Sequence, residues 1–306
     1  STDPDSPLFV PRPGGSQGFP GYSPSNTVDQ SRTNLSLYTD SEFDITKSFL
    51  VSAAARFENY SDFGTTLNGK LAARIKASEN FNIRGSVSTG FRAPSLAQIY
   101  YNLRFTNFSS SGASEILLSP NNSPVTRAFG IDKLNEEKAV NASLGFTSSF
   151  GNFTATVDGY MINVKDRIVL TGYFDATDLN IGVESAQFFV NGVDTKTTGL
   201  DVVFAWKKKF GDNTFNATLV GNINNMKIDK VKNGTLDKEI FFGEREKAFL
   251  LASAPESKFG LNLSYDKKWF NSGIAFTRFS DMKLIDYGGA TDFYSAKVVT
   301  DLTLGF

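Results

Sequence analysis

Apolar and polar residues alternate with a period of two along most of the chain, from residue 34 to its end. The first such segment sets Leu35, Leu37, Phe43 and Ile45 against Ser36, Asp40, Glu42 and Asp44. Successive residues of a strand point to opposite faces, so each segment predicts a strand with one apolar and one polar face. The pattern recurs often enough to predict about eleven strands, joined as antiparallel hairpins.

The connections between these strands alternate between tight turns and longer segments. Tight turns fall near residues 47, 79, 151, 211 and 269, whereas the other connections lie near 62 and over 93–136, 171–185, 231–257 and 282–293. Successive hairpin ends lie on opposite sides of a sheet, so the tight turns share one rim and the longer connections share the other. This arrangement is typical of bacterial outer-membrane barrels.

Large aromatic residues cluster at the tight turns: Phe49, Phe81, Phe150, Phe153, Phe210, Phe215, Trp269 and Phe270. Such a ring is typical of the girdle at a membrane interface. The alternative is a soluble β-sandwich with a phenylalanine core. The segments 153–170 and 186–208 are long for the strands of a globular sheet, which weighs against it. We therefore predict an all-β, antiparallel transmembrane β-barrel.

The longest irregular stretch follows a strand that Pro94 ends, because proline cannot donate a ladder hydrogen bond. We find no sustained period over 93–136 and expect a long loop there, and one or two helical turns near 244–251. Candidate ligand contacts in the longer connections are Tyr100, Tyr101, Arg104, Phe105, Phe108, Tyr173, Phe174, Phe241, Phe242 and Arg245. Aromatic rings together with arginine suit a flat anionic or glycosidic ligand. The alternative is that these side chains pack the loops onto their neighbours.

Composition narrows the possible chemistry. The 306 residues carry a net charge of -1 and contain neither histidine nor cysteine. The charge gives no nucleic-acid footprint, and the missing residue types exclude disulfides, thiolate metal sites and Ser-His-Asp catalysis. Asp175 and Asp178 lack the spacing of an EF-hand loop. We predict no catalytic residue, metal or cofactor, and interpret Lys207–Lys209 as a solvated run near the tight-turn rim.

Several segments resemble TonB-dependent outer-membrane receptors. They are Ser88-Thr-Gly-Phe-Arg-Ala-Pro-Ser-Leu-Ala-Gln98, Arg56-Phe-Glu-Asn-Tyr-Ser-Asp-Phe-Gly64, Leu134-Asn-Glu-Glu-Lys138, Asp158-Gly-Tyr-Met-Ile-Asn-Val-Lys-Asp-Arg-Ile168 and Gly18-Phe-Pro-Gly21. Each segment alone is weak, but together they span nearly the whole chain in the family's order.

The resemblance implies that the chain corresponds to the C-terminal half of a barrel of the 22-stranded type. It implies an extracellular loop over 1–31, four strands over 32–92, a long extracellular loop over 93–136, and the remaining strands and loops over 137–306. A plug domain is absent from these residues, and we expect truncation at both ends. A terminal phenylalanine such as Phe306 also resembles a barrel-assembly signal, so both interpretations of the C-terminus stay open.

The functional expectation is energy-coupled import of a large, scarce nutrient: a ferric chelate, a cobalamin-like compound or a glycan. The alternative is a passive channel or a structural or assembly component of an outer-membrane complex; the missing histidine disfavours a hydrolase. Implied partners are a TonB-type energy-transducing protein, the missing plug and barrel strands, outer-membrane lipid and a possible surface lipoprotein, but no nucleic acid. The implied location is the outer membrane of a Gram-negative bacterium. Charges on the polar, lumen-facing side of the strands, such as Arg74, Lys76 and Arg84, are expected to pair with a plug or with one another.

Overall fold

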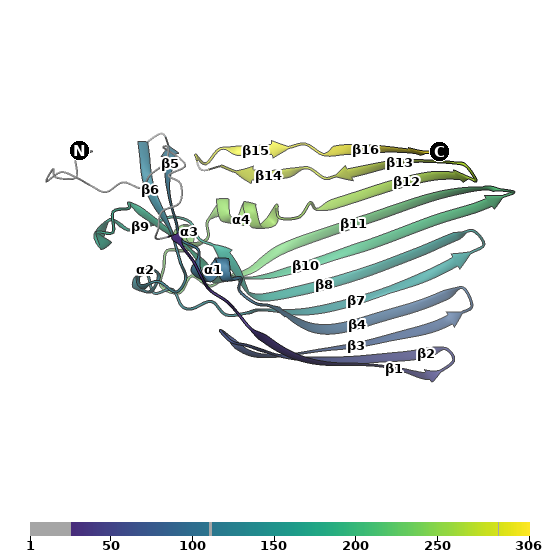
Figure 1. Cartoon of the computed structure of the whole chain (residues 1–306), viewed down its shortest axis with the longest axis horizontal. Coiled ribbons are helices and arrows are strands. Elements are labelled where there is room, and N and C mark those ends of the chain that lie inside the picture. The colour runs from purple at the N-terminus through teal and green to yellow at the C-terminus, as the bar shows by residue number, and fades with distance from the viewer. Residues whose placement is uncertain (1–25, 110–111, 287) are drawn as a thin grey trace.

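Eleven strands lie side by side in one antiparallel sheet, which the computed structural model shows as a broad curved wall (Figure 1). The structure describes residues 26–109, 112–286 and 288–306, so most of the expected loop 1–31 and the Gly18–Gly21 motif lie outside it. In spatial order the strands are β1 (Asn34–Thr46), β2 (Phe49–Tyr60), β3 (Gly64–Ser78), β4 (Phe81–Arg92), β7 (Glu137–Phe150), β8 (Phe153–Leu170), β10 (Ser185–Phe210), β11 (Asn213–Val231), β12 (Ser257–Lys267), β13 (Phe270–Phe279) and β16 (Lys297–Gly305). The expected number of wall strands and their hairpin order are confirmed.

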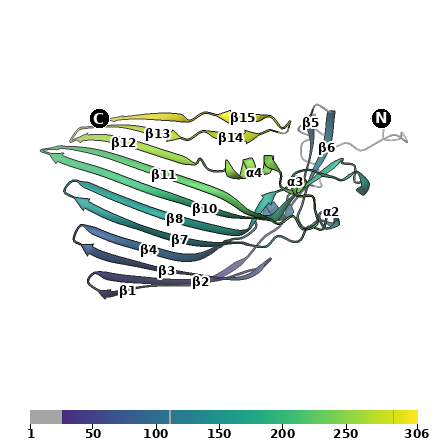
Figure 2. The same cartoon turned by 180° about the vertical axis from the view of Figure 1, so that it is seen from behind.

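The predicted separation of the two rims is also confirmed. The five tight turns gather at one end of the sheet, whereas the longer connections gather at the opposite end (Figures 1 and 2). Within the described residues β1 and β16 pair with β2 and β13 but not with each other. The barrel is therefore partial and not closed.

No helix in the described part of the chain is both long enough and apolar enough to cross a membrane.

The register of the strands preserves the predicted faces. Leu37, Phe57 and Leu67 pair across three strands on the apolar face, and Asp158 pairs with Asp201 on the polar face. Large apolar side chains on the first face are exposed, including Leu67 at 74% and Leu144 at 68%. A soluble sheet would bury such a face, because exposed apolar surface is costly in water. The wall instead presents one apolar and one polar surface.

The longer connections are more ordered than the sequence predicts. The expected irregular loop 93–136 contains α1 (Leu96–Tyr100), β5 (Leu103–Ser109), β6 (Gly112–Ser119) and α2 (Pro124–Ala128). The segment 171–185 contains β9 (Phe174–Asp175) and the 3-10 helix η2 (Thr177–Leu179), and 231–257 contains α3 (Lys238–Phe241) and α4 (Glu244–Leu251). The segment 282–293 forms most of a separate hairpin, β14 (Met282–Ile285) with β15 (Thr291–Tyr294). The helical segment expected near 244–251 is confirmed, but the expectation of an irregular 93–136 is wrong.

The buried apolar core lies among these connections. Its buried members come from β6, β8, β9, β10, α3 and their flanking loops: Leu117, Ile131, Val169, Phe174, Ala176, Val183, Ala186, Phe188, Val190, Val193, Phe241 and Phe242. We call the body built around them the loop cluster. It lies at the end of the wall opposite the tight turns (Figures 1 and 2).

Candidate functional site

The chain leaves the wall for the loop cluster at a fixed point, the end of β4. There the Arg92 guanidinium donates to both carboxylate oxygens of Glu137, at 2.8 and 2.5 Å. Glu137 is buried and also accepts the backbone N–H of Ile168 at 2.7 Å. Pro94 follows and is fully buried. Arg92 and Pro94 therefore fix the end of β4, as the sequence predicts for Pro94.

Two of the predicted ligand contacts end the short helix that follows. Ser95 caps α1 with its hydroxyl, which accepts the Gln98 N–H at 3.1 Å, while the Gln98 side chain accepts the Ser95 N–H at 3.0 Å. This reciprocal capping box satisfies two N–H groups that a helix start leaves unpaired. Tyr100 is the last residue of α1 and Tyr101 its C-cap, and both are half-buried.

The hairpin β5–β6 carries three further candidates. The Arg104 guanidinium donates to the carbonyl oxygen of Ile181 at 2.8 Å, which ties this hairpin to the loop after η2. Phe105 is half-buried and pairs with Ile116 of β6. The backbone of Phe108 belongs to β5, but its side chain lies outside the described residues.

One strand joins the loop cluster to the wall. β10 has 26 residues, and its first four, Ser185–Phe188, pair in parallel with Ile116–Ser119 of β6. β9 pairs antiparallel with the same end of β10. The later residues of β10 pair with β8 and β11 in the wall. The loop cluster is thus built on an extension of a wall strand.

Three of the predicted ligand contacts lie inside the cluster instead of on its surface. Phe174, Phe241 and Phe242 are only 6%, 3% and 1% exposed. The Phe174 ring lies 6.0 Å from that of the fully buried Phe188, and Phe129 lies within 5.6 Å of both rings. Burial of such apolar rings stabilises the packing of the loops. For these three residues the structure supports the packing interpretation, because a ligand at the cluster surface would not reach their rings.

The last two candidates also contact their own surroundings. Tyr173 is half-buried immediately before β9. The Arg245 guanidinium lies 3.2 Å from the Glu246 carboxylate and 4.7 Å from the centre of the Phe249 ring on the same helix. This cation–π contact leaves the Phe249 ring itself 46% exposed. In the segment 231–257, the ring beside Arg245 that a ligand could reach is therefore that of Phe249, whereas the rings of Phe241 and Phe242 are buried.

Sequence reasoning missed the polar groups that fix the cluster internally. Asn121 is 2% exposed. Its amide nitrogen donates to the carbonyl oxygens of Asp132 and Phe189, at 3.1 and 3.2 Å, and its amide oxygen accepts the Leu134 N–H at 3.0 Å. One side chain thus ties the exit of the 93–136 segment to β10. Buried polar groups satisfied in this way specify a single loop conformation.

A second missed group lies in the motif that ends β8. Asp166 adopts a positive φ of 57° at a bulge, and its N–H donates to the Asp194 carboxylate at 2.9 Å. Lys232, just after β11, donates to both carboxylates at 2.6 Å. Partial burial acts to lower the pKa of Lys232, but the hydrogen bonds that its ammonium donates to the two carboxylates raise the pKa above its ordinary value. The positive φ of a non-glycine residue was the local property that sequence alone does not reveal.

The acidic residues of the η2 segment form a turn. The Asp175 carboxylate accepts the backbone N–H and the hydroxyl of Thr177, at 2.9 and 2.7 Å. These two hydrogen bonds lower the pKa of Asp175. Within the described residues no cluster of three His, Cys, Asp or Glu side chains forms a metal site.

The polar face of the wall carries a spanning ion pair. Arg84 reaches across β7 to Asp158, with contacts of 3.0 and 2.5 Å. Between them lies Gly145, where a Cβ would overlap the Asp158 carboxylate. Lys76 pairs with Glu79 at 2.8 Å. Arg84 and Lys76 therefore each pair with a carboxylate of this chain and not with each other. Pairing of these charges with a plug stays a prediction.

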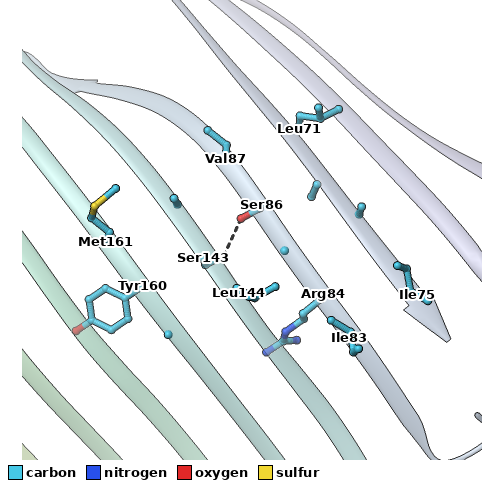
Figure 3. Close-up of a pocket in the computed structure, with 15 residues that line it drawn as sticks. Leu71, Ile75, Ile83, Arg84, Ser86, Val87, Ser143, Leu144, Tyr160 and Met161 are labelled. Carbon is cyan, nitrogen blue, oxygen red and sulfur yellow. Dashed lines mark hydrogen bonds between the residues drawn. The ribbon is translucent and has the colours of Figure 1, made fainter. Parts of the chain in front are cut away.

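Two depressions mark the two faces of the wall. On the polar face, a depression of about 500 Å³ is lined by Glu42, Leu50, Ser52, Lys70, Ala72, Ala73, Arg74, Arg84, Gly85, Ser86, Ser143, Asp158, Tyr160 and Asp201. On the apolar face, a shallow depression of about 820 Å³ lies among Leu71, Ile83, Val87 and Leu144 (Figure 3). A hydrogen bond of 2.9 Å between Ser86 and Ser143 joins the two strands at its floor (Figure 3). The depression on the polar face offers charged side chains of both signs, which are groups that can orient a hydrophilic ligand.

Residues 3–306 match the family model described as TonB dependent receptor-like, beta-barrel. A comparison with curated protein sequences finds no match.

Solved structures with a similar fold include proteins that are named for different cargoes. The siderophore receptor PirA from Acinetobacter baumannii is 18% identical with a TM-score of 0.61, over 90% of this chain and 39% of that one. A variant of the ferric enterobactin receptor PfeA from Pseudomonas aeruginosa is 15% identical with a TM-score of 0.63, over 95% and 40%. The copper transporter OprC is 14% identical with a TM-score of 0.56, over 89% and 39%. The chain thus spans about two fifths of the length of these structures.

Proposed function

Because the chain belongs to the TonB-dependent receptor β-barrel family, we propose that it is the wall and outer-loop part of a receptor that imports a large, scarce nutrient. The chain lies in the outer membrane of a Gram-negative bacterium, as the barrels of this family do. A receptor of this kind binds and passes its cargo without breaking bonds, so it is not an enzyme. The tight turns face the periplasm in this proposal, and the loop cluster faces the cell exterior.

The observation that carries the proposal is the loop cluster itself. It is a packed body with its own apolar core and internal polar ties, built on the extended end of β10. A preorganised surface loses less conformational entropy when it binds a ligand than a disordered loop does. Tyr100, Tyr101 and Arg104 are half-buried on this body, so each keeps part of its side chain accessible. These residues, with Phe105, are the contacts that we propose for the cargo.

A ferric chelate is the first cargo class to test. Two of the solved structures compared above carry siderophore or ferric enterobactin in their names, although likeness at this identity extends to the fold alone. Aromatic rings and a guanidinium suit an anionic chelate with flat ring systems. Cobalamin-like compounds and glycans stay in the proposal as further classes.

Energy coupling and partners complete the proposal. A TonB-type protein would supply the energy through parts of the receptor outside this chain, and a plug would fill the space beside the polar face. The depression there, with Lys70, Arg74 and Asp201, offers charges of both signs for such contacts. A surface lipoprotein is a further possible partner in this proposal.

The test is uptake by cells that produce the full-length receptor. Cells that produce the receptor should take up a supplied ferric chelate, and this uptake should stop when the membrane potential is dissipated. Replacing Tyr100, Tyr101 and Arg104 together by alanine should reduce uptake at equal surface expression. Tyr294→Ala, an exposed tyrosine on the separate β14–β15 hairpin, is the matched control.

The alternative functions predict different results. A passive channel would admit its solute whether or not the membrane is energised. A structural or assembly component would give no uptake of any chelate, cobalamin-like compound or glycan supplied. Uptake that is unchanged in the triple variant would contradict the assigned residues while leaving the import function standing.

A further inference from the structure

Two lysines at the tight-turn rim point away from the polar face. Lys208 of β10 pairs with Phe215 of β11, and Phe215 pairs with Tyr265 of β12, so all three share the apolar face. Lys267 lies two residues after Tyr265 and therefore on the same face. Strand spacing and rise place the Cα atoms of the two lysines roughly 12 Å apart.

Both lysines keep their charge available. Each is exposed, and no carboxylate in the described ranges forms an ion pair with either of them. The neighbouring Lys268 is different, because it pairs with Asp212 at 2.9 Å. An exposed, unpaired ammonium on an otherwise apolar face calls for an anionic group beside that face.

Aromatic rings surround the two lysines at the same level of the wall. Trp206 and Phe215 stack edge to face at 5.8 Å, and the Lys267 ammonium lies 5.9 Å from the Trp269 ring. The rings of Tyr265 and Phe270 continue the group, with centres 6.5 Å apart. Amphipathic aromatic residues occupy the headgroup level of a bilayer, so the lysines lie where lipid phosphates lie.

We propose that Lys208 and Lys267, within this aromatic group, bind the headgroup of an anionic phospholipid in the leaflet that borders the tight turns. The long lysine side chains extend along apolar surface and present their ammonium groups to the phosphate. The acyl chains of this lipid then lie against the apolar face, on the side of the aromatic group that faces away from the tight turns. In this proposal the middle residue of Lys207–Lys209 lies on the apolar face, whereas Lys207 and Lys209 stay solvated on the polar face.

The alternation within Lys207–Lys209 supplies a matched control. Lys207 and Lys209 pair with Asn216 and Thr214, on the polar face. Removing them deletes two positive charges, as K208A with K267A does, but from the polar side of the strand that carries Lys208. A general effect of positive charge near the membrane would not distinguish the two pairs.

The experiment is native mass spectrometry of the purified full-length receptor, titrated with phosphatidylglycerol or phosphatidylcholine. We expect the wild-type receptor to retain phosphatidylglycerol in preference to phosphatidylcholine. Each lysine near a lipid surface contributes about a 5-fold change in affinity, so K208A with K267A should weaken phosphatidylglycerol binding about 30-fold. K207A with K209A should leave it unchanged, and K208R with K267R should retain most of it.

Three results would overturn the proposal. They are equal retention of the two lipids by the wild-type receptor, equal losses in the two alanine pairs, and loss of binding in the arginine pair when the barrel is folded. Folding is checked by the gel mobility shift of heated and unheated samples. The test does not depend on the imported cargo, so it separates this proposal from the proposed function.

Discussion

Replacing Asn121 by alanine should loosen the loop cluster while leaving the wall intact. The side chain is almost fully buried and makes hydrogen bonds to Asp132, Phe189 and Leu134. Alanine removes all three bonds and leaves their backbone partners without them. The segment that leaves the cluster toward β7 would then lose its attachment to β10.

The size of the effect follows from these bonds. Each hydrogen bond contributes about 1 kcal/mol net, and a buried backbone group left unpaired costs more. The free energy that keeps the cluster closed should therefore fall by at least about 3 kcal/mol in the variant. A tenfold change in an equilibrium corresponds to about 1.4 kcal/mol, so local opening of the cluster should become at least about 100-fold more frequent.

Hydrogen exchange followed by mass spectrometry of the full-length receptor in lipid measures this opening. Amides of β6 and of residues 185–190 should exchange about 100-fold faster in the variant, whereas β2 and β3 should not change. Asn122→Ala is the matched control, because Asn122 is the exposed neighbour of Asn121 and its side chain makes no hydrogen bond within the described chain. If the two variants exchange alike, the cluster does not depend on the Asn121 contacts and the argument for a preorganised loop body fails.

Two other changes test the wall and the cluster surface. Gly145→Ala should destabilise the barrel by about 1–3 kcal/mol, since the new Cβ would overlap the Asp158 carboxylate that pairs with Arg84. Denaturant unfolding in lipid vesicles measures this loss of stability. Gly159→Ala is the control and should be close to wild type, because its Cβ would have no atom nearer than 3.8 Å. Acidification should loosen α4, because a hydrogen bond and charge from Lys247 lower the pKa of Glu244. That contribution is present above the usual glutamate pKa of about 4.3 and is lost as the pH falls through the lowered value. Protection of α4 amides should therefore decline in this range in wild type, and an equal decline in Glu244→Gln would contradict the assignment.

The wall was predictable because its determinants are local and repeated. Alternation of apolar and polar residues and tight turns recur from β1 to β16. The register of each strand is set by its apolar face and by the turn to the neighbouring strand. The bounds of β8, Phe153–Leu170, follow from such patterns. Where the alternating segment is long, it contains enough repeats of the two-residue period to identify a strand.

The loop cluster was not predictable in the same way. α1 and α2 have five residues each, too few to show a helical period. Their capping residues, Ser95 with Gln98 and Ser123 before Pro124, were the available signal. The pairing of β6 with β10 joins segments that are distant in sequence and parallel, which no local pattern specifies.

The candidate site was predictable only in part, for the same reason. The sequence singled out aromatic residues in the longer connections but could not separate buried from accessible ones, because both uses select the same residue types. Phe174, Phe241 and Phe242 became core when β9, α3 and β10 came together. Asn121 was overlooked because an asparagine in a loop has no pattern until its partners are known.

The sharing of β10 between the wall and the loop cluster constrains the order in which the molecule assembles. β6 and β9 both pair with its first residues, and neither pairs with the other within the described residues. The loop that carries β6 therefore emerges early in the chain and must wait until β10 has been made before it finds its partner. Contacts between such distant segments form late, since a long stretch of chain must be closed first. The outer surface of the receptor would accordingly mature after its wall, and the unpaired β5–β6 hairpin would be exposed to proteases and chaperones in the interval.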